Sequence, residues 1–273
     1  MKNNQKIKII AEIGWNHMGK MYLAKKMIEE AAKAGADYCK FQTWSTKNLV
    51  KGPWDKDGRF QIYKKAELTE KNYKFLIKTC RQNKVKFLTS VFNVDDLKKL
   101  KKLNFDEIKI PSHEVYNLKL IKKASKLYKT LLISVGACRW NEFLKIVKNI
   151  KIKNVIFMHC VSSYPLESKN VNFPKFFAIK KKVDNIGYSG HLAGIDDALF
   201  AISNGAKYIE KHFTINNNLP GRDNKFAILP NDLRKICQYR DSVSLMTKNK
   251  GLNIQKCEID IYKKYRGRWS GKR

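Results

Sequence analysis

The chain has 273 residues, of which 43% are hydrophobic and only six are proline. This length suits one large domain, because α/β barrels use roughly 200–250 residues as a single unit. A chain of this size buries about three quarters of the surface that its unfolded form exposes, so it needs no disulfide or metal to stabilise its core. The length therefore excludes a small domain held together by covalent staples.

The six cysteines contain no Cys-x-x-Cys pair, so free and mostly buried thiols in a reducing compartment are expected. The N-terminal segment 1–17 is basic but lacks the apolar run of roughly 7–15 residues that a signal peptide carries. No segment approaches the length of about 20 apolar residues that crosses a bilayer. We expect a cytoplasmic protein with no membrane partner.

The formal net charge is +32, from 56 Lys and Arg against 24 Asp and Glu. The lysines are spread over every amphipathic segment, for example at 98–103, 122–129 and 180–182. Lysine also far outnumbers arginine, which bidentate recognition of nucleic acids favours. Solvated helix faces therefore explain the charge better than a nucleic-acid partner does. A positive field would still attract small anionic substrates.

Short apolar runs alternate with amphipathic stretches along the chain. Strands are expected at 7–13, 38–44, 86–92, 107–112, 131–136, 155–160, 185–190 and 208–213. Apolar residues at helical spacing predict helices at 21–35, near 70–83, 95–103, 117–127, 140–151, 173–182, 195–204 and 231–247. Gly35 is the expected C-terminal cap of the first helix, and Asp95 and Asn231 are expected N-caps of two later ones.

Eight strands alternating with eight helices predict an α/β protein of the closed (β/α)8 TIM barrel type. An open doubly wound sheet is the competing fold, but the Gly-x-Gly-x-x-Gly turn after its first strand is absent. The barrel is expected over 1–247, with a long connection at 45–69 that is typical of an active-site lid. Residues 248–273 are expected to form a basic C-terminal tail or linker.

Polar side chains occur where the expected strands end. The catalytic groups of such barrels gather at the C-terminal ends of the strands, and a purely structural core would not need ionisable residues there. The candidates, in chain order, are Glu12, Lys40, Gln42, Lys109, Ser112, Glu114, Ser134, His159, Ser162, Tyr164, Ser189, His191, Glu210 and His212.

Among five histidines, His191 and His212 follow or end neighbouring strands and should meet at the barrel mouth. Two imidazoles with open positions beside them suit a divalent ion such as Mn²⁺, Fe²⁺ or Zn²⁺. For His159, a structural role with its ring nitrogens bonded inside the fold is as good an interpretation as a functional one.

Lys40 and Lys109 lie inside apolar strands, where a lysine must find an anion or lose its charge. They could anchor the phosphate and carboxylate of a small acid, or one could form a Schiff base. Nearby serine hydroxyls favour the anion cradle. Glu12, Glu114 and Glu210 could each handle a proton or pair with a lysine, and the sequence leaves both open.

Eight segments of the chain resemble the sialic acid synthases and their relatives that make legionaminic and pseudaminic acids. The match follows the family's order and spacing across roughly residues 7–247. The segments are AEIGWNHMG (11–19), KAGADYCKFQTW (33–44), KIPSHEVYN (109–117), ISVG (133–136), HCVSSYP (159–165), GYSGHLAGID (187–196), GAKYIEKHFT (205–214) and LPGRDNKFAILP (219–230).

The resemblance implies a (β/α)8 barrel that condenses phosphoenolpyruvate with an N-acylated hexosamine such as N-acetylmannosamine, releasing phosphate and a nonulosonic acid. It implies a divalent metal, Mn²⁺ first and Mg²⁺, Co²⁺ or Fe²⁺ as alternatives, held by His191 and His212. Glu12 would be the catalytic carboxylate near the metal-bound water. The substrates would be bound by Lys40, Gln42, Lys109, Ser112, Glu114, Ser134, Ser162, Tyr164, Ser189, Glu210 and Asp223.

Three positions differ from the usual pattern of that family. Ser162 stands where relatives often have asparagine, Trp15 where they have a smaller residue, and Gly190 where they have an aspartate beside the metal. The family's C-terminal antifreeze-like domain is not recognised, so a separate chain carrying it, or a homodimer, is an expected partner. A synthase acting on a phosphorylated aldose stays an alternative, as does a non-catalytic basic barrel that binds an acidic partner.

Overall fold

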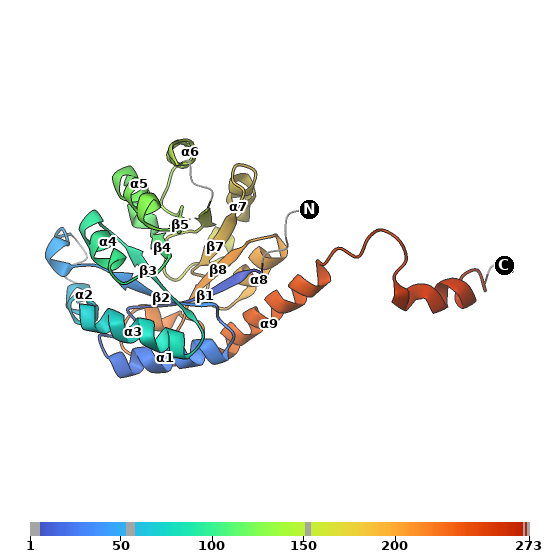
Figure 1. Ribbon diagram of the computed structural model, residues 1–273, viewed down its shortest axis with the longest axis horizontal. Coiled ribbons are helices and arrows are strands. Elements are labelled where there is room, and N and C mark those ends of the chain that lie inside the picture. Colours follow the sequence, from blue (N-terminus) through green and yellow to red (C-terminus); the bar gives the residue numbers. More distant parts are fainter. Residues whose placement is uncertain (1–5, 53–57, 151–153, 270, 272–273) are drawn as a thin grey trace.

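The computed structural model describes residues 6–52, 58–150, 154–269 and 271. Eight parallel strands, hydrogen-bonded in sequence order, close into a barrel surrounded by helices (Figure 1), which confirms the (β/α)8 prediction. The strands are β1 (Lys8–Gly14), β2 (Tyr38–Thr43), β3 (Lys86–Val91), β4 (Glu107–Ile110), β5 (Thr130–Ser134), β6 (Val155–His159), β7 (Ile186–Gly190) and β8 (Tyr208–His212).

Each barrel strand is followed by a helix that packs on the outside of the sheet. The helices are α1 (Met21–Lys33), α2 (Arg59–Ala66), α3 (Glu70–Gln82), α4 (Val94–Lys101), α5 (Leu118–Leu127), α6 (Trp140–Asn149), α7 (Phe173–Lys180), α8 (Asp196–Ser203) and α9 (Pro230–Met246). Their buried apolar faces and the outward side chains of the strands form the main core. All eight expected helices are present.

Helix α2 was not predicted, and it lies in the connection expected at 45–69. Its apolar residues are weakly segregated and only Ala66 is buried, so helical periodicity could not reveal it. Residues 53–57 of the same connection lie outside the described residues.

Two of the expected helix caps are wrong. The side chain of Asn93, not Asp95, accepts the hydrogen bond from the amide of Asp96 at the start of α4. The N-cap of α9 is Leu229 rather than the expected Asn231, and the first helical residue is Pro230. Proline fits this position because its fixed φ suits the start of a helix. Gly35 follows α1 with φ +96 as expected of a terminating glycine.

The inward face of the barrel has two layers. A small apolar cluster, which includes Ile10, Tyr38, Leu88 and Leu132, fills the lower part. Two residues further along the same strands, the inward positions carry Glu12, Lys40, Ser90 and Ser134, all buried. Because side chains alternate along a strand, a closed apolar floor therefore lies directly beneath a polar layer.

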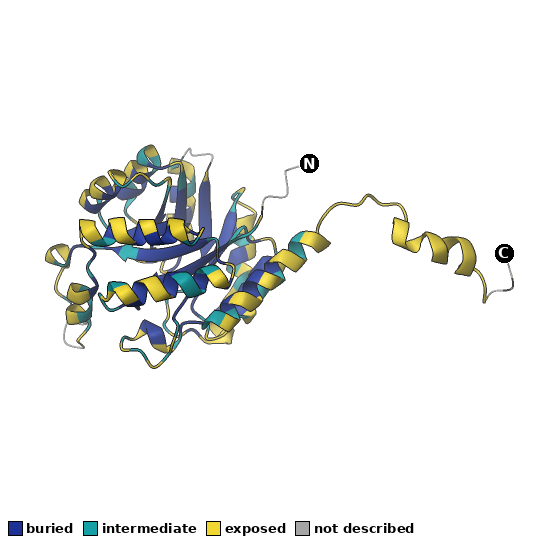
Figure 2. Cartoon of the chain, turned by 60° about the horizontal axis from the view of Figure 1, so that its bottom comes forward, coloured by how far each residue is buried: buried dark blue, intermediate teal, exposed yellow. Residues whose placement is uncertain are grey.

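The C-terminal arm, residues 248–269, leaves the barrel after α9 and runs away from it (Figure 1). Every residue of the arm is exposed (Figure 2), including Leu252, Ile261 and Trp269. It contains only short helical turns at Lys256–Glu258 and Ile261–Tyr265. Within the described parts of the chain, no helix has the length and apolar character needed to cross a bilayer.

Candidate active site

Four buried ions meet at the C-terminal ends of β1, β2, β4 and β8. The Lys40 ammonium lies 2.7 Å from Glu12 Oε1 and 3.6 Å from Glu210 Oε1. The Lys109 ammonium lies 2.7 Å from Glu210 Oε1 and donates to Ser189 Oγ at 3.3 Å. Gln42 Nε2 donates to Glu12 Oε1 at 2.7 Å. We call Glu12, Lys40, Lys109 and Glu210 the mouth cluster.

Burial and mutual charge shift the pKa values of the mouth cluster. Burial raises the pKa of Glu12 above its usual value, although Lys40 opposes the shift. Burial also acts on Glu210, but the attraction of Lys109 and Lys40 outweighs it and lowers the pKa of this carboxyl. Burial lowers the pKa of Lys109, and Glu210 only partly compensates. The two carboxyls therefore differ in proton affinity, as an acid and a permanent anion must.

The mouth cluster leaves polar atoms without a protein partner. Glu12 Oε2, Glu210 Oε2 and Ser134 Oγ are buried and accept or donate no hydrogen bond among the described residues. Buried polar groups in folded proteins are almost always bonded, so orphaned atoms at one place indicate a site for a polar ligand. Carboxylate oxygens accept hydrogen bonds, so a ligand here would bring donors such as hydroxyl groups to them, while the ammonium groups of Lys40 and Lys109 could hold an anionic group.

His191 and His212 lie side by side, with ring centroids 5.4 Å apart. His191 Nδ1 lies 2.8 Å from the carbonyl oxygen of Val161, which can only accept, so Nδ1 carries the proton and Nε2 keeps its lone pair. Burial and the neighbouring cations lower the pKa of His212 well below its usual value. Burial acts to lower the pKa of His191 too, but Cys160 and the Val161 carbonyl outweigh it and raise that pKa. The His212 ring therefore has the neutral imidazole lone pair that a metal requires, whereas His191 must give up any second proton when a metal binds.

A serine-lined pocket adjoins the ion cluster at the end of β5. Gly136 N donates to Ser112 Oγ at 3.2 Å. A Cβ atom at Gly136 would lie 2.5 Å from Ser162 Oγ and 2.7 Å from Ser112 Oγ. Only glycine leaves room for both hydroxyls here, and the arrangement suits the oxygens of a phosphate or carboxylate.

Most of the expected site residues line one cavity. Those that do are Glu12, Lys40, Gln42, Lys109, Ser112, Ser134, Tyr164, Ser189, His191, Glu210 and His212. The structure therefore brings together side chains from seven strands or the loops that follow them, as expected from their positions at strand ends.

Three expected residues lie beside this cavity rather than in its described lining. Ser162 Oγ is 4.0 Å from Cys160 Sγ, and Glu114 accepts a hydrogen bond from Asn117 at 3.2 Å. Asp223 Oδ2 lies 3.6 Å from His212 Nδ1 and accepts a short hydrogen bond from the Trp15 indole. Asp223 thus lies beside the histidine pair and outside the described lining of the mouth cavity.

The cavity also includes Ser90, Phe92, Pro111, His113 and Cys160, which were not among the expected site residues. Ser90 could have been found, because it pairs in register with Gln42 and Lys109 on the neighbouring strands. Cys160 lies 3.4 Å from Ser112 Oγ and 3.9 Å from His191 Nδ1. A thiol among apolar residues gives no distinguishing pattern in the sequence.

His159 lies outside the mouth, in line with its structural interpretation, but only one of its ring nitrogens is bonded, since Nδ1 has no partner among the described residues. Its Nε2 lies 2.9 Å from the carbonyl oxygen of Val171, and its ring packs against Phe173, Phe176 and Tyr188 outside the barrel. Burial lowers its pKa to about 4. It is therefore a neutral packing residue.

Gly190 does not face the mouth. A Cβ atom there would lie 2.3 Å from Asp197 Oδ2 and 2.6 Å from Tyr188 Cε1, both on the side of β7 that packs against α8. A side chain at this position would point toward Asp197 and away from the His191 and His212 rings, so the expectation that Gly190 removes a carboxylate from beside the metal does not fit this geometry.

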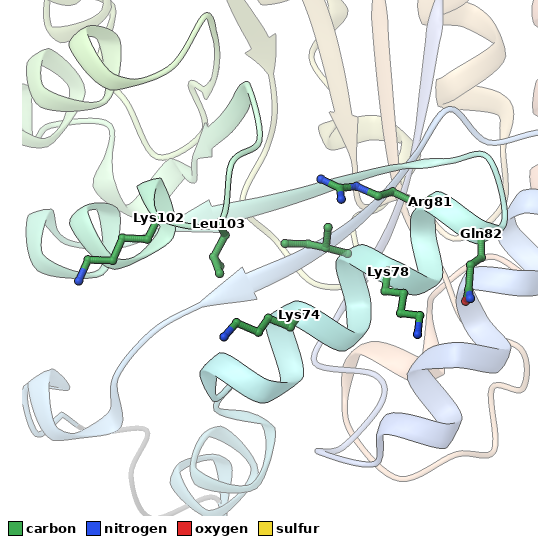
Figure 3. Close-up of a pocket in the computed structure, with 7 residues that line it drawn as sticks. Lys74, Lys78, Arg81, Gln82, Lys102 and Leu103 are labelled. Atoms are coloured by element: carbon green, nitrogen blue, oxygen red, sulfur yellow. The ribbon is translucent and has the colours of Figure 1, made fainter.

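A second hollow lies on the outside of the barrel, between α3 and the turn after α4 (Figure 3). Its lining carries Lys74, Lys78, Arg81 and Lys102 over Ile77 and Leu103, with Gln82 at one end. These residues precede β3 and β4, so they lie toward the end of the barrel opposite the mouth. The hollow shares no residue with the mouth cavity.

Known proteins are similar to this chain over most of its length. N,N'-diacetyllegionaminic acid synthase of Campylobacter jejuni is 36% identical over 251 residues, which cover 85% of this chain and 75% of that protein. N-acetylneuraminate-9-phosphate synthase of Drosophila melanogaster is 33% identical, over 84% of this chain and 65% of that protein.

A solved structure extends the likeness to three dimensions. The N-acetylneuraminic acid synthetase of Leptospira borgpetersenii superposes with a TM-score of 0.87 and 30% identity, over 100% of this chain and 97% of that one. The sequence profile of the NeuB family matches residues 27–251. Because this match spans more than half of the chain, it shows that the chain belongs to the NeuB family.

Proposed function

We propose that the chain is a C–C bond-forming transferase that condenses phosphoenolpyruvate with an N-acylated hexosamine, of the N-acetylmannosamine type, to a nonulosonic acid and phosphate. The observation that carries the proposal is the mouth cluster, in which two buried lysines pair with two buried glutamates while Glu12 Oε2, Glu210 Oε2 and the nearby Ser134 Oγ keep no protein partner. Membership of a family whose relatives are nonulosonic acid synthases supports the same reaction.

Lys40 and Lys109 are the proposed anchors for the phosphate and carboxylate of phosphoenolpyruvate. Both are at most 3% exposed, so their charges act in a water-poor site where they are worth more than in solvent. Hydroxyls of Ser112, Ser134, Ser162 and Ser189 complete the cradle. Burial acts to lower the pKa of Lys40, but the attraction of Glu12 and Glu210 outweighs it and raises that pKa. At Lys40 this favours a charged anchor over a Schiff base, which needs a free neutral amine.

His191 and His212 are the proposed holders of a divalent metal, with Mn²⁺ first. Metal–nitrogen bonds are roughly 2.0–2.1 Å long, and ring centroids 5.4 Å apart leave space for one ion between the rings. Across the described residues, no group of three His, Cys, Asp or Glu side chains forms a ready metal site. A metal held by the two histidines would need water and the sugar to complete its coordination. When bound, the metal would polarise the aldehyde and lower the pKa of a water.

The residues of the chain would organise the remaining steps. The enol carbon attacks the aldehyde carbon, and the aldehyde oxygen takes up a proton as the C–C bond forms. Glu12 is the proposed acid for that proton, because burial raises its pKa and keeps it protonated over a wider range of pH. Water then adds at the phosphate-bearing carbon and gives one proton back to the Glu12 carboxylate. The tetrahedral intermediate expels phosphate, which takes the remaining hydroxyl proton as the C=O bond forms.

Glu114, Tyr164, Glu210 and Asp223 are the proposed groups that face or orient the sugar. The Tyr164 ring lies 4.2 Å from the His191 ring with the Arg222 guanidinium 5.3 Å above it. Gln42 would hold Glu12 in place. The exact sugar is set by contacts in this region.

We place the reaction in the cytoplasm because five of the six cysteines are buried free thiols, which a reducing compartment preserves. A homodimer is the proposed assembly. The exposed apolar side chains of the C-terminal arm support it, because such side chains are commonly covered by a partner. Sedimentation of the full chain beside one truncated at 248 tests this proposal.

The deciding experiment is a phosphate-release screen. Phosphoenolpyruvate is offered with a panel of N-acylated hexosamines, their dideoxy relatives and phosphorylated aldoses, with Mn²⁺ present and after chelation. We expect release only with an N-acylated hexosamine, lost on chelation and in His212→Ala. Release with phosphorylated aldoses alone would assign the alternative synthase, and release that survives chelation would remove the metal role.

The basic barrel that binds an acidic partner is the remaining alternative. The external hollow of Lys74, Lys78, Arg81 and Lys102 is where it would act. Salt-sensitive binding of a polyanion with no turnover of any sugar would favour it.

A further inference from the structure

A second buried ion pair lies on the outer face of β7 and β8, behind the mouth. The Lys211 ammonium donates to both carboxylate oxygens of Asp197 at 2.9 Å. Its third hydrogen bond, at 2.7 Å, goes to the carbonyl oxygen of Leu192. Asp197 also accepts from the Tyr188 hydroxyl at 3.0 Å and from the amide of Ala198 at 2.8 Å. We call Lys211 and Asp197 the rear pair.

The rear pair holds the backbone that carries His191. Leu192 follows His191 directly, and Lys211 precedes His212, so the Lys211–Leu192 bond ties together the two peptides that present the histidine pair. The carbonyl of His191 itself accepts a hydrogen bond from the amide of Leu166 at 3.0 Å. The backbone at His191 and Leu192 is therefore held by one hydrogen bond from Lys211 of β8 and one from Leu166 in the loop after β6. The ring of His191 is held by its own bond to the Val161 carbonyl.

Asp197 is what fixes the direction of the Lys211 ammonium. The Lys211 side chain is only 3% exposed, and the two bonds to Asp197 use two of its three protons. Without the carboxylate, a four-carbon side chain with a desolvated charge would turn toward another acceptor or toward water. The bond to Leu192 would then be lost with it.

Gly190 makes this arrangement possible. A Cβ atom at 190 would overlap Asp197 Oδ2 at 2.3 Å and Tyr188 Cε1 at 2.6 Å. A side chain there therefore needs the Tyr188 ring to shift, which loss of its hydrogen bond to Asp197 permits. The backbone of Gly190 lies in register with Lys211 on the next strand. A side chain at 190 and the carboxylate of Asp197 therefore compete for one space beside the same ammonium. A carboxylate can be supplied from β7 or from α8, but not from both.

We propose that Asp197, acting through Lys211, is a positioning residue for His191. Gly190 permits this, because a residue without a side chain leaves the space beside Lys211 to the Asp197 carboxylate from α8. The consequence for turnover rests on the function proposed above, whereas the effect on the His191 ring does not. The two can therefore fail separately.

The test uses the full chain labelled with ¹⁵N-histidine, and it compares Asp197→Asn with the double variant Gly190→Asp/Asp197→Ala. Asp95→Asn is the matched control, because Asp95 is also the second residue of its helix but is 77% exposed. Long-range ¹H–¹⁵N spectra at one pH report which nitrogen of the His191 ring carries the proton, with the resonance assigned by its loss in His191→Gln. The kcat and KM for phosphate release are measured in parallel.

We expect the Nδ1–H signature of His191 to weaken in Asp197→Asn, and kcat to fall about 10–100-fold with KM nearly unchanged, as is usual when the support of a metal-holding histidine is removed. The double variant should recover both, and Asp95→Asn should change neither. An unchanged His191 spectrum in folded Asp197→Asn would overturn the proposal, even if its melting temperature falls.

If Asp197→Asn does not fold, the double variant decides. A folded double variant with the wild-type His191 spectrum supports the proposal. An altered spectrum, or a double variant that also fails to fold, contradicts the shared position of the two carboxylates. Wild-type protein without turnover on any sugar would reject the proposed function alone, because the His191 spectra would still test the positioning role.

Discussion

The mouth cluster and the rear pair are two buried ion groups on opposite faces of the same strands, and they differ in how far their bonds are satisfied. In the mouth, Glu12 Oε2 and Glu210 Oε2 have no hydrogen-bond partner within the described chain. At the rear, both oxygens of Asp197 and all three protons of the Lys211 ammonium are bonded. Both groups pair lysines with carboxylates, but the mouth cluster has polar atoms left to bind a ligand, whereas the rear pair has none.

This difference in hydrogen bonding indicates that the mouth cluster binds a ligand and that the rear pair supports the backbone around the site. An unsatisfied buried group is costly in the free protein and is compensated when a ligand arrives. A satisfied pair contributes nothing to a ligand but fixes the backbone around it. Substitutions in front should therefore change turnover more than stability, and substitutions behind should change stability first.

The largest effect is expected for Lys211→Met. Removing one partner of a buried pair leaves the charge of Asp197 uncompensated, which costs about 3–5 kcal/mol of unfolding free energy. Urea unfolding measures the loss. Lys207→Met is the control, because Lys207 is only half-buried and its ammonium bonds the neutral side chain of Asn185. Equal losses of unfolding free energy in the two variants would show that the buried pair of Lys211 with Asp197 adds no more stability than a half-buried lysine does.

Next in size is Lys109→Met at the mouth. The kcat/KM for phosphoenolpyruvate should fall by about 10²–10³-fold, because a charge aimed at the substrate anion is lost. Unfolding free energy should fall less than in Lys211→Met, since Lys40 still lies 3.6 Å from Glu210 Oε1. A variant that loses stability but keeps its kcat/KM would place Lys109 among the supporting residues.

A smaller effect is expected on acidification, from His159 on the outside of the barrel. Its pKa is about 4 in the folded chain and about 6.5 when unfolded, so below pH 6.5 the unfolded state takes up the proton first. Stability present above pH 6.5 should be lost down to pH 4, by up to about 3 kcal/mol. Comparison of urea midpoints across this range in wild type and His159→Gln should show a shallower slope for the variant.

The smallest effect is expected for removal of residues 249–273. The arm is exposed throughout its described length, so its loss should change the unfolding free energy of the barrel by less than about 0.5 kcal/mol. Urea unfolding of the truncated chain at low protein concentration checks this. A larger loss would mean that the arm contacts the barrel of its own or another copy.

Much of this structure could be predicted from the sequence, because alternation and helical spacing are properties of local segments. Strand ends placed Glu12, Lys40 and Lys109 at the mouth, and the fold brings them together as expected. Asp197 could not be found in this way. Its role depends on the contact of α8 with β7 and on the missing side chain of Gly190, which are matters of distance rather than of pattern.

The apolar floor inside the barrel has a consequence for the order of events. Ile10, Tyr38, Leu88 and Leu132 are each at most 1% exposed, so nothing passes through the barrel and everything enters and leaves by one opening. Under the proposed function, phosphoenolpyruvate and the sugar would both enter by this opening, and the joined product would have to leave by it before the next cycle could start.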